Sequence, residues 1–458
     1  MHKCLESKKS SQANLVQIRG QKRRMMVYAA RNGSPEEARS ISLSGVGIRV
    51  LVDNKSWGFS STNRLDQNAV DLTLENGLKL AKASSRLRKR ATPYEPCEPV
   101  TADFLTPSRK PLDSASIEEF AKIPLEACSG AQDAKGHLAE AKAACLSIED
   151  DKYFVSSEGS CIHQQITRLM LFVDVIAKIG SVICPASENV GHSGGMELFD
   201  EALPYSIGKT VAEKANRLLS AKAPPSGHFT VVVHPTLCAT LLHEAIGHPL
   251  EADLALSGGG FGSQFGKNVS SELVTIFDDG NIAGGLGRFQ FDDEGTECKH
   301  TILIERGILR SFMHDRTSAA LTGVCPTGNA HAWDYSVEPL IRQTNIGLEA
   351  GAYSLEEMIE GVKEGLFLDG TFGGQADPSA DFTFGFQSAN WIRDGKIAEQ
   401  LRGANVSGNA IGVFKTIDAV GKDVVLRPGA CGKYQFAVQG RVVPAIRCRI
   451  MVGGTGGT

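Results

Sequence analysis

The chain has 458 residues, of which 42% are hydrophobic and 22% are charged, a balance typical of globular proteins that excludes wholesale disorder. This length suits about two or three domains with buried cores, and we expect two. The 48 basic and 52 acidic side chains leave no excess positive charge, so neither nucleic acid nor an anionic membrane surface is an expected partner.

No segment predicts a membrane span or a secretion signal. The longest apolar run, residues 169–184, is interrupted by Asp174 and Lys178 and is shorter than the roughly 20 apolar residues of a spanning helix. The amino terminus is polar and basic with no apolar stretch behind it, so we expect a cytoplasmic protein. The 11 cysteines are scattered without a CxxC pair, and most are expected to be reduced and buried.

The first half of the chain, residues 1–225, predicts an α/β domain. Short strands between residues 14 and 62 are expected to form an antiparallel meander with a turn at residues 53–56. Helices are predicted over residues 65–87, 117–146 and 203–221, and further strands over residues 152–183. Five prolines between residues 93 and 111 predict an irregular connector.

The second half, residues 226–458, predicts a mainly β domain, because its segments are short, rich in glycine and often hairpin-like. Together the two halves predict an α+β fold. Residues 229–235 are expected to form a buried strand, and the segment that begins at Pro235 is expected to form a helix. The glycine-rich segment 257–266 predicts either a mobile wall of a binding site or an ordinary surface loop.

The helix predicted after Pro235 carries the motif HExxxH, from His243 to His248. In the common zinc-peptidase motif the two histidines are four residues apart, which places them on one face of a regular helix. The spacing here is five residues, so both histidines can reach one metal ion only if the helix contains a π-turn or a break. Gly247 and Pro249 favour such a distortion, because glycine is permissive and proline has no N–H for the helix ladder.

With that distortion, Glu244 lies beside the first histidine and is a candidate general base for a metal-bound water. The alternative is an amphipathic helix whose histidines are surface or core residues without a metal. A catalytic zinc site also needs a third protein ligand. Spacing alone does not choose among the downstream candidates, which are Glu251, Asp253, His314, His331, Cys298, Cys325, Cys431 and Cys448.

Nine segments of the chain match those of one known family. They are GVGIRVLVDNKSWGFSSTN, LLHEAIGHPLEAD, SSELVTIFDDG, FDDEGT, CPTGNAHAWDY, IRQTN, FGGQADPSADFTF, RPGACGKYQF and VGGTGGT. On these segments the chain resembles the TldD/PmbA family, in particular its TldD-like branch. The resemblance implies a zinc-dependent peptidase with the catalytic site in residues 226–458. Its metal ligands in this sequence would be the two histidines of the motif and a cysteine of the late CGK segment: His243, His248 and Cys431.

The residue pattern around Cys431 agrees with this choice. Cys431 stands between glycines, where we expect a tight turn that approaches a metal, and a nearby cation would favour its thiolate. Cys298, Cys325 and Cys448 are expected to be structural. The acidic runs at residues 278–279 and 292–294 suggest either a second cation site or turn structure, and the pattern favours turns.

The resemblance also implies substrates and partners. It implies small or unfolded peptides that lie extended in a cavity, and a homodimer or a heterodimer with a related subunit. His331, Arg342 and Asn345 lie in matching segments and are candidates for substrate binding, with structural hydrogen bonding as the alternative for each. Two other functions stay open: a non-catalytic partner subunit in a peptide-processing or modification complex, and zinc chemistry on another amide, as in deformylation. The non-catalytic partners of the family lack HExxxH, so the motif favours a peptidase.

Overall fold

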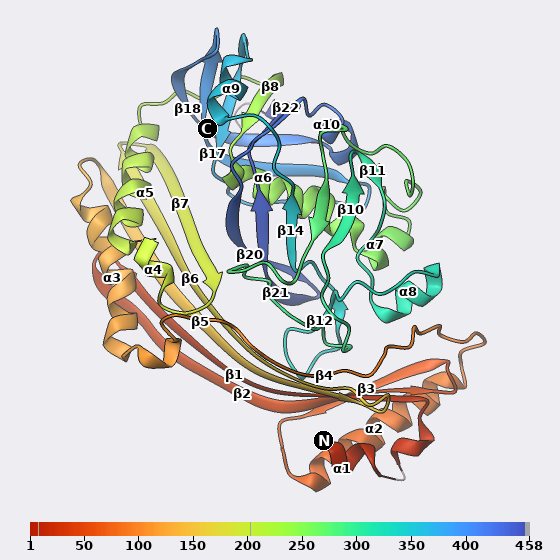
Figure 1. Ribbon diagram of the computed structural model, residues 1–458. Coiled ribbons are helices and arrows are strands. Elements are labelled where there is room, and N and C mark those ends of the chain that lie inside the picture. Colours follow the sequence, from red (N-terminus) through yellow and green to blue (C-terminus); the bar gives the residue numbers. More distant parts are fainter. Residues whose placement is uncertain (8, 202, 454–458) are drawn as a thin grey trace.

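Long antiparallel strands dominate the first half of the chain. They are β1 (Leu15–Arg31), β2 (Ser34–Val52), β3 (Ser56–Thr62), β5 (Leu138–Ser156), β6 (Cys161–Ile179) and β7 (Val182–Ser193). With β4 (Thr101–Leu105) they form one sheet in the order β3-β2-β1-β5-β6-β4, with β7 paired to β6. In this computed structural model, which describes residues 1–7, 9–201 and 203–453, the sheet is a long curved layer along one side of the molecule (Figure 1).

Helices cover the outer face of this sheet. They are α1 (His2–Leu5), α2 (Gln67–Ser85), α3 (Ile117–Asp133), α4 (Leu198–Glu201) and α5 (Pro204–Leu218), with short 3-10 turns at Ser10–Gln12 and Leu112–Ser114. The helix α2 packs on β2 and β3, and α3 and α5 pack side by side on the other end of the sheet (Figure 1). A Cβ atom at Gly208 would lie 1.8 Å from the carbonyl oxygen of Ala127, so this glycine allows α3 and α5 to touch backbone to backbone.

Two predictions for the first half are wrong in detail. The short strands expected before residue 32 are one strand, because β1 pairs along its length with β2 on one side and β5 on the other. The helix predicted over residues 117–146 ends at Asp133, and residues 138–146 belong to β5. Local alanine-rich sequence favours a helix there, but Ala141, Ala143 and Cys145 alternate into the core beneath α3, and strand pairing on both sides overrides the local preference.

The connector between residues 93 and 111 is irregular except for β4, and the turn after β2 is confirmed. Residues 53–55 link Val52 to its partner Ser56, and Asp53 and Asn54 have φ values of 55° and 49°, as the two central residues of a type I′ turn do. The helices predicted over residues 65–87 and 203–221 are confirmed as α2 and α5.

Two further large sheets form the second half of the chain. The first has the strand order β11-β10-β9-β14-β21-β20, and the second has the order β15-β8-β22-β18-β17-β16 with β19 on β22. In the second sheet β15 also pairs with β17, so five of its strands close into a ring. The predicted α+β class and the mainly β second half are confirmed.

The elements of this half have the following bounds. The strands are β8 (Gly227–Val233), β9 (Ile276–Asp278), β10 (Thr301–Glu305), β11 (Ile308–Leu309), β12 (Ala330–His331), β13 (Leu340–Ile341), β14 (Asn345–Leu348), β15 (Glu364–Asp369), β16 (Gly374–Ala376), β17 (Asp381–Arg393), β18 (Lys396–Asn409), β19 (Ala419–Val420), β20 (Val425–Lys433), β21 (Gln435–Val443) and β22 (Ile446–Gly453). The helices are α6 (Pro235–Leu241), α7 (Ala252–Leu256), α8 (Arg316–Thr322), α9 (Leu355–Glu360) and α10 (Ala410–Phe414).

The helical segment that begins with α6 lies between these two sheets (Figure 1). Its apolar residues, among them Leu241, Leu242 and Ile246, belong to one core with residues of both sheets. The named strands of residues 1–225 and of residues 226–458 belong to different sheets, and the domain boundary between them stays a prediction. Within the described chain no helix is both long and apolar enough to cross a membrane. Residues 454–458, the end of the matching VGGTGGT segment, lie outside the described residues.

Candidate metal centre

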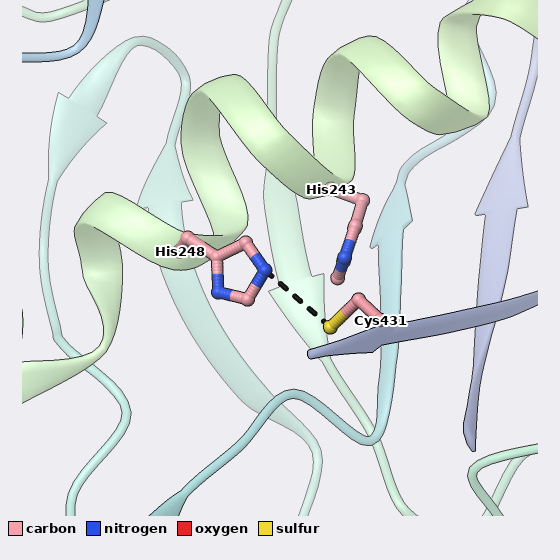
Figure 2. Close-up of side chains that lie close together, drawn as sticks. All are labelled: His243, His248 and Cys431. Carbon is pink, nitrogen blue, oxygen red and sulfur yellow. Dashed lines mark hydrogen bonds between the residues drawn. The ribbon is translucent and has the colours of Figure 1, made fainter. Parts of the chain in front are cut away.

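The helix after β8 leaves α geometry within the HExxxH segment. The helix α6 ends at Leu241, Leu242–Gly247 forms a π-helical turn, and His248–Leu250 forms a 3-10 turn. The predicted widening is confirmed: the imidazole rings of His243 and His248 lie on one side of the segment, with ring centroids 4.6 Å apart (Figure 2). Gly247 also leaves room for a neighbouring side chain, since a Cβ atom there would lie 2.2 Å from Oε1 of Gln343.

Cys431 approaches the two imidazoles from the strand β20. Its Sγ atom lies 3.5 Å from Nε2 of His248, and one ligand atom from each of His243, His248 and Cys431 lies within 4.8 Å of the others (Figure 2). The tight turn predicted around Cys431 is wrong, because Cys431 pairs with Ala437 inside the β20–β21 ladder and the hairpin turns at Tyr434, whose φ is 60°. A strand holds the sulfur more rigidly than a turn would.

A second layer of side chains orients both imidazoles. Nδ1 of His243 lies 2.6 Å from Oε1 of Gln343, and Nδ1 of His248 lies 2.9 Å from Oε1 of Glu251. Both partners offer oxygen acceptors, so Nδ1 of each ring donates the hydrogen bond, and Nε2 is the atom that could bind a metal once it is unprotonated. Paired Nδ1–H groups of this kind are typical of metal-binding histidines. In this structure the amide of Gln439 lies 2.8 Å from Nε2 of His243.

Cationic side chains surround the sulfur of Cys431. Nη2 of Arg342 lies 2.7 Å from Sγ. Burial raises the pKa of the Cys431 thiol, but the hydrogen bond with His248 and the charge of Arg342 outweigh burial and hold this pKa below its ordinary value. The thiolate, which is the form that binds a metal, is therefore favoured at this position.

The carboxylate of Glu244 lies beside both imidazoles. Its two oxygens are 3.7 Å from Nε2 of His243 and 3.8 Å from Nε2 of His248. Burial raises the pKa of Glu244, and the charges of His248 and Arg441 oppose that increase. A carboxylate with a raised pKa in this position can accept a proton from a water molecule at the centre.

A cleft of about 590 Å³ opens onto these side chains. It is lined by Glu244, by His248, by the end of β20 with Cys431, and by residues 373–376, which include β16. Both β16 and β20 are the last strands of their sheets. Each therefore presents main-chain groups at a sheet edge.

The other candidate metal ligands do not join the group formed by His243, His248 and Cys431. Within the described residues, the only His, Cys, Asp and Glu side chains that gather closely enough to share a metal ion are His243, His248 and Cys431. Glu251 is fully buried and bonds to His248 and Lys433, and Asp253 also bonds to Lys433. The remaining alternatives are either buried elsewhere, as are Cys298, Cys448, His314 and His331, or exposed, as is Cys325. Cys325 was expected to be a structural cysteine in a strand core or at an edge, and its exposed position outside any strand shows that expectation to be wrong.

The three candidates for substrate binding differ in their placement. Asn345 is fully buried and bonds to backbone groups of Asp279 and Gly287, so it holds a loop. Arg342 is buried and donates to Cys431 and to backbone oxygens near the hairpin, so it supports the sulfur. His331 is buried and stacks on Phe289, with ring centroids 4.3 Å apart, and does not line the cleft.

The acidic runs are structural, as the turn alternative predicted. Asp278 accepts hydrogen bonds from Thr344 and Asn329. Asp293 pairs with Lys152 of β5, and Glu294 pairs with Arg49 of β2, so the second run ties the two halves of the chain together. Oδ1 of Asp292 accepts hydrogen bonds from two backbone N–H groups of its own turn.

Sequence reasoning missed Gln343, which lies between β13 and β14, and Gln439 of β21, both of which contact His243. Gln343 lies in the matching IRQTN segment, which was the available signal. Gln439 lies eight residues after Cys431 in β21, and only the register of the hairpin brings it to the imidazole.

Family models match the chain in three parts. These are the PmbA/TldA metallopeptidase domain 1 over residues 16–83, the central domain over residues 110–219 and the C-terminal domain over residues 226–454. A metalloprotease of Methanothermobacter thermautotrophicus is 35% identical to this chain, covering 93% of this chain and 92% of that protein. A zinc metalloprotease TldD homologue of Saccharolobus solfataricus is 29% identical, covering 86% of each.

Solved structures share the fold. TM0727 of Thermotoga maritima, named as a candidate modulator of a DNA gyrase, has a TM-score of 0.80 at 21% identity and covers 99% of each chain. TldE of Thermococcus kodakarensis has a TM-score of 0.79 at 18% identity and covers 97% of this chain and 98% of that chain. At these identities the likeness shows the fold alone.

Proposed function

Because this chain belongs to the PmbA/TldA metallopeptidase family, we propose that it is a zinc-dependent peptidase that hydrolyses small or unfolded peptides. The observation that supports this proposal most strongly is the approach of Cys431 to the two histidines of a helix segment 183 residues earlier in the chain. The same three residues are those that the sequence resemblance implied as metal ligands.

The donor set fits zinc. Two imidazole nitrogens and one thiolate form a mixed N and S set that zinc accepts in catalytic sites, where a fourth position is left for water or substrate. Gln343 and Glu251 hold the two rings through Nδ1, which leaves Nε2 of each for the ion, and Nε2 of His248 lies next to Sγ of Cys431. We propose that His243, His248 and Cys431 hold the ion. Zinc bound there would supply a Lewis acid that polarises a carbonyl group and lowers the pKa of water.

Glu244 is the proposed general base. Its carboxylate lies within 4.0 Å of Nε2 of both histidines, on the side of the cleft. A carboxylate oxygen of Glu244 accepts the proton of the attacking water and passes it to the nitrogen of the leaving amine. Partial burial of Glu244 raises the pKa of the carboxyl group in the direction that such a transfer requires.

The cleft suits an extended peptide. Two edge strands, β16 and β20, border it, and an edge strand binds the main chain of a peptide by hydrogen bonds that do not depend on sequence. We propose broad sequence specificity for this reason. We also propose that the chain forms a homodimer or pairs with a related subunit, in line with the TldE protein that shares its fold.

The alternative is a non-catalytic partner subunit in a peptide-processing or modification complex. Such a role does not require an acid-base residue beside a set of metal donors. Glu244 lies next to both imidazoles, and this placement favours an enzyme.

Peptide hydrolysis by the zinc-loaded protein tests the proposal. Unmodified peptides and their N-formylated forms are incubated with the wild type, Glu244→Gln and Cys431→Ala, and the products are identified by mass. Glu244→Gln should retain zinc and lose most turnover, whereas Cys431→Ala should lose zinc as well. Cys325→Ala is the matched control, because Cys325 is exposed and lies outside the cleft. Peptide hydrolysis that survives both active-site changes would end the proposal, and removal of formyl groups alone would support deformylation instead.

A further inference from the structure

Arg441 lies in the cleft and has no role in holding the proposed metal ligands. It stands on β21, where it lines the same cleft as Glu244, His248 and Cys431. Gln439 precedes it by two residues and contacts His243, so both side chains extend from the same face of the strand. The guanidinium group of Arg441 is therefore directed toward the region where a peptide would lie.

The guanidinium group of Arg441 has no anionic partner. Within the described residues it makes no hydrogen bond or ion pair, and its Nε atom is buried without a hydrogen-bond partner. Glu244 and Cys431 attract it electrostatically, but the Glu244 oxygens do not come within 4.0 Å of its nitrogens and Cys431 makes no hydrogen bond with it. Arg441 as a whole is half-buried, and withdrawing an unpaired charge even partly from water is costly, so an arginine in such a place normally has an anion nearby.

The other cations around the cleft are all engaged. Arg342 bonds to Cys431, Lys433 bonds to Glu251 and Asp253, and Arg427 pairs with Glu188. Arg427 lies directly opposite Arg441 in the β20–β21 ladder. Among the described residues no carboxylate lies within ion-pair distance of Arg441, whose guanidinium group lines the cleft.

A glycine forms the support for this guanidinium group. A Cβ atom at Gly429 would lie 2.7 Å from Nε and 2.8 Å from Cζ of Arg441, so the group lies across the bare backbone of β20. Gly429 and Cys431 are two residues apart in one strand and therefore face the same side. The guanidinium group therefore lies on the face of β20 from which Cys431 extends.

We propose that Arg441 binds a carboxylate group of the peptide substrate close to the scissile bond. This inference rests on the proposed peptidase function and specifies its substrate class. The planar fork of a guanidinium group matches a carboxylate with two parallel hydrogen bonds. The carboxylate has two sources in a peptide, the free carboxyl terminus and an Asp or Glu side chain. In the first case the enzyme removes residues near the carboxyl end, and in the second it prefers an acidic residue at one position.

Matched peptide pairs test the inference and distinguish the two sources. One pair has the same sequence with a free or an amidated carboxyl terminus. The second set is amidated and carries Glu or Gln at each position in turn. For wild type we expect kcat/KM to be about ten- to a hundredfold higher for the charged member of one pair, the usual value of a hydrogen-bonded charge. Arg441→Met should reduce this ratio to about one, and Arg441→Lys should retain part of it.

Arg427→Met is the matched control, because it removes the opposing arginine of the same hairpin, and it should keep the wild-type ratio. Equal rates for both members of every pair in the wild type would overturn the inference. An equal loss of kcat/KM on the charged and the uncharged peptide in Arg441→Met would also overturn it, because it would mean that Arg441 acts through Glu244.

Failure of the proposed function would be distinguishable from failure of this inference. If the zinc-loaded wild type hydrolyses no peptide, the peptidase proposal fails, and the inference is tested by binding. Fluorescently labelled peptide pairs are titrated into Glu244→Gln and into Glu244→Gln with Arg441→Met, and anisotropy is measured. Tighter binding of the charged peptide that depends on Arg441 supports the inference, and equal binding of both members overturns it.

Discussion

The backbone N–H of His248 donates a hydrogen bond to the carbonyl oxygen of His243, five residues earlier. In a regular α-helix a step of five residues would turn the second side chain by about 140°. The single wide turn returns the imidazole of His248 to that of His243, and Cys431 then reaches both from β20. A local change in helix hydrogen bonding thus creates the site for the proposed metal.

Gly247→Ala should weaken metal binding. The added methyl group would meet Gln343 at 2.2 Å and displace the side chain that orients His243. Loss of such an orienting partner typically lowers metal affinity by about 10- to 100-fold. Competition with a chromophoric zinc chelator measures the effect. Gly432→Ala is the control, because nothing lies within 4 Å of its added Cβ atom. Unchanged affinity in Gly247→Ala would show that Gln343 does not orient the ring.

Lys433→Met should destabilise the protein strongly. The ammonium group of Lys433 contacts Glu251, which is fully buried, and Asp253. Without Lys433 the carboxylate of Glu251 keeps only His248 as a cationic partner. Leaving a buried charge with too little compensation costs about 3–5 kcal/mol in the free energy of unfolding, which urea titration measures. Adding Glu251→Gln should restore part of that loss. If Lys433→Met unfolds at the same urea concentration as the wild type, the ion pair between Lys433 and Glu251 does not stabilise the protein.

The free energy of unfolding should decrease as pH falls, because His331 is buried in its neutral form. Burial lowers the pKa of His331 from 6.5 to about 3, and its ring nitrogens have no well-formed hydrogen bond. The unfolded chain binds a proton at His331 below about pH 6.5 and the native state does not, so stability falls by about 1.4 kcal/mol per pH unit until pH approaches 3. His331→Phe keeps the stacking on Phe289 and should remove this part of the slope. Urea unfolding at several pH values measures it, and a wild-type slope in the variant would refute the assignment.

His331→Phe also decides the substrate-binding candidate of the sequence analysis. Because His331 does not line the cleft, the variant should hydrolyse peptides at the wild-type rate near neutral pH. A large increase in KM without loss of stability would place His331 in contact with substrate after all.

Local chemistry predicted the parts of the site that depend on neighbouring residues. Gly247 and Pro249 predicted a loosened helix ladder, and the π-helical turn is there. The third ligand could not be predicted in this way. Spacing alone did not select Cys431 from the eight candidate ligands downstream of the helix, and only the family resemblance pointed to it. Cys431 lies on a strand whose position depends on the packing of a whole sheet. A local sequence pattern does not predict that position.

The errors have the same physical origin. Residues 138–146 prefer a helix locally but pair with strands on both sides, and such tertiary pairing is invisible in a window of neighbouring residues. Gln439 and Arg441 reach the cleft through the register of the β20–β21 hairpin, in which Cys431 pairs with Ala437. A register shift by one residue would turn both side chains to the opposite face.

The central claim is that one ion binds His243, His248 and Cys431 together, and the absorption spectrum of the cobalt-substituted protein tests it most directly. Cobalt(II) accepts the same donors as zinc, and a thiolate ligand adds a sulfur-to-metal charge-transfer band. We predict one bound cobalt ion per chain with this band in the wild type and in Cys325→Ala, and loss of the band in Cys431→Ala. A wild-type spectrum without the band, or one that Cys431→Ala leaves unchanged, would contradict the account.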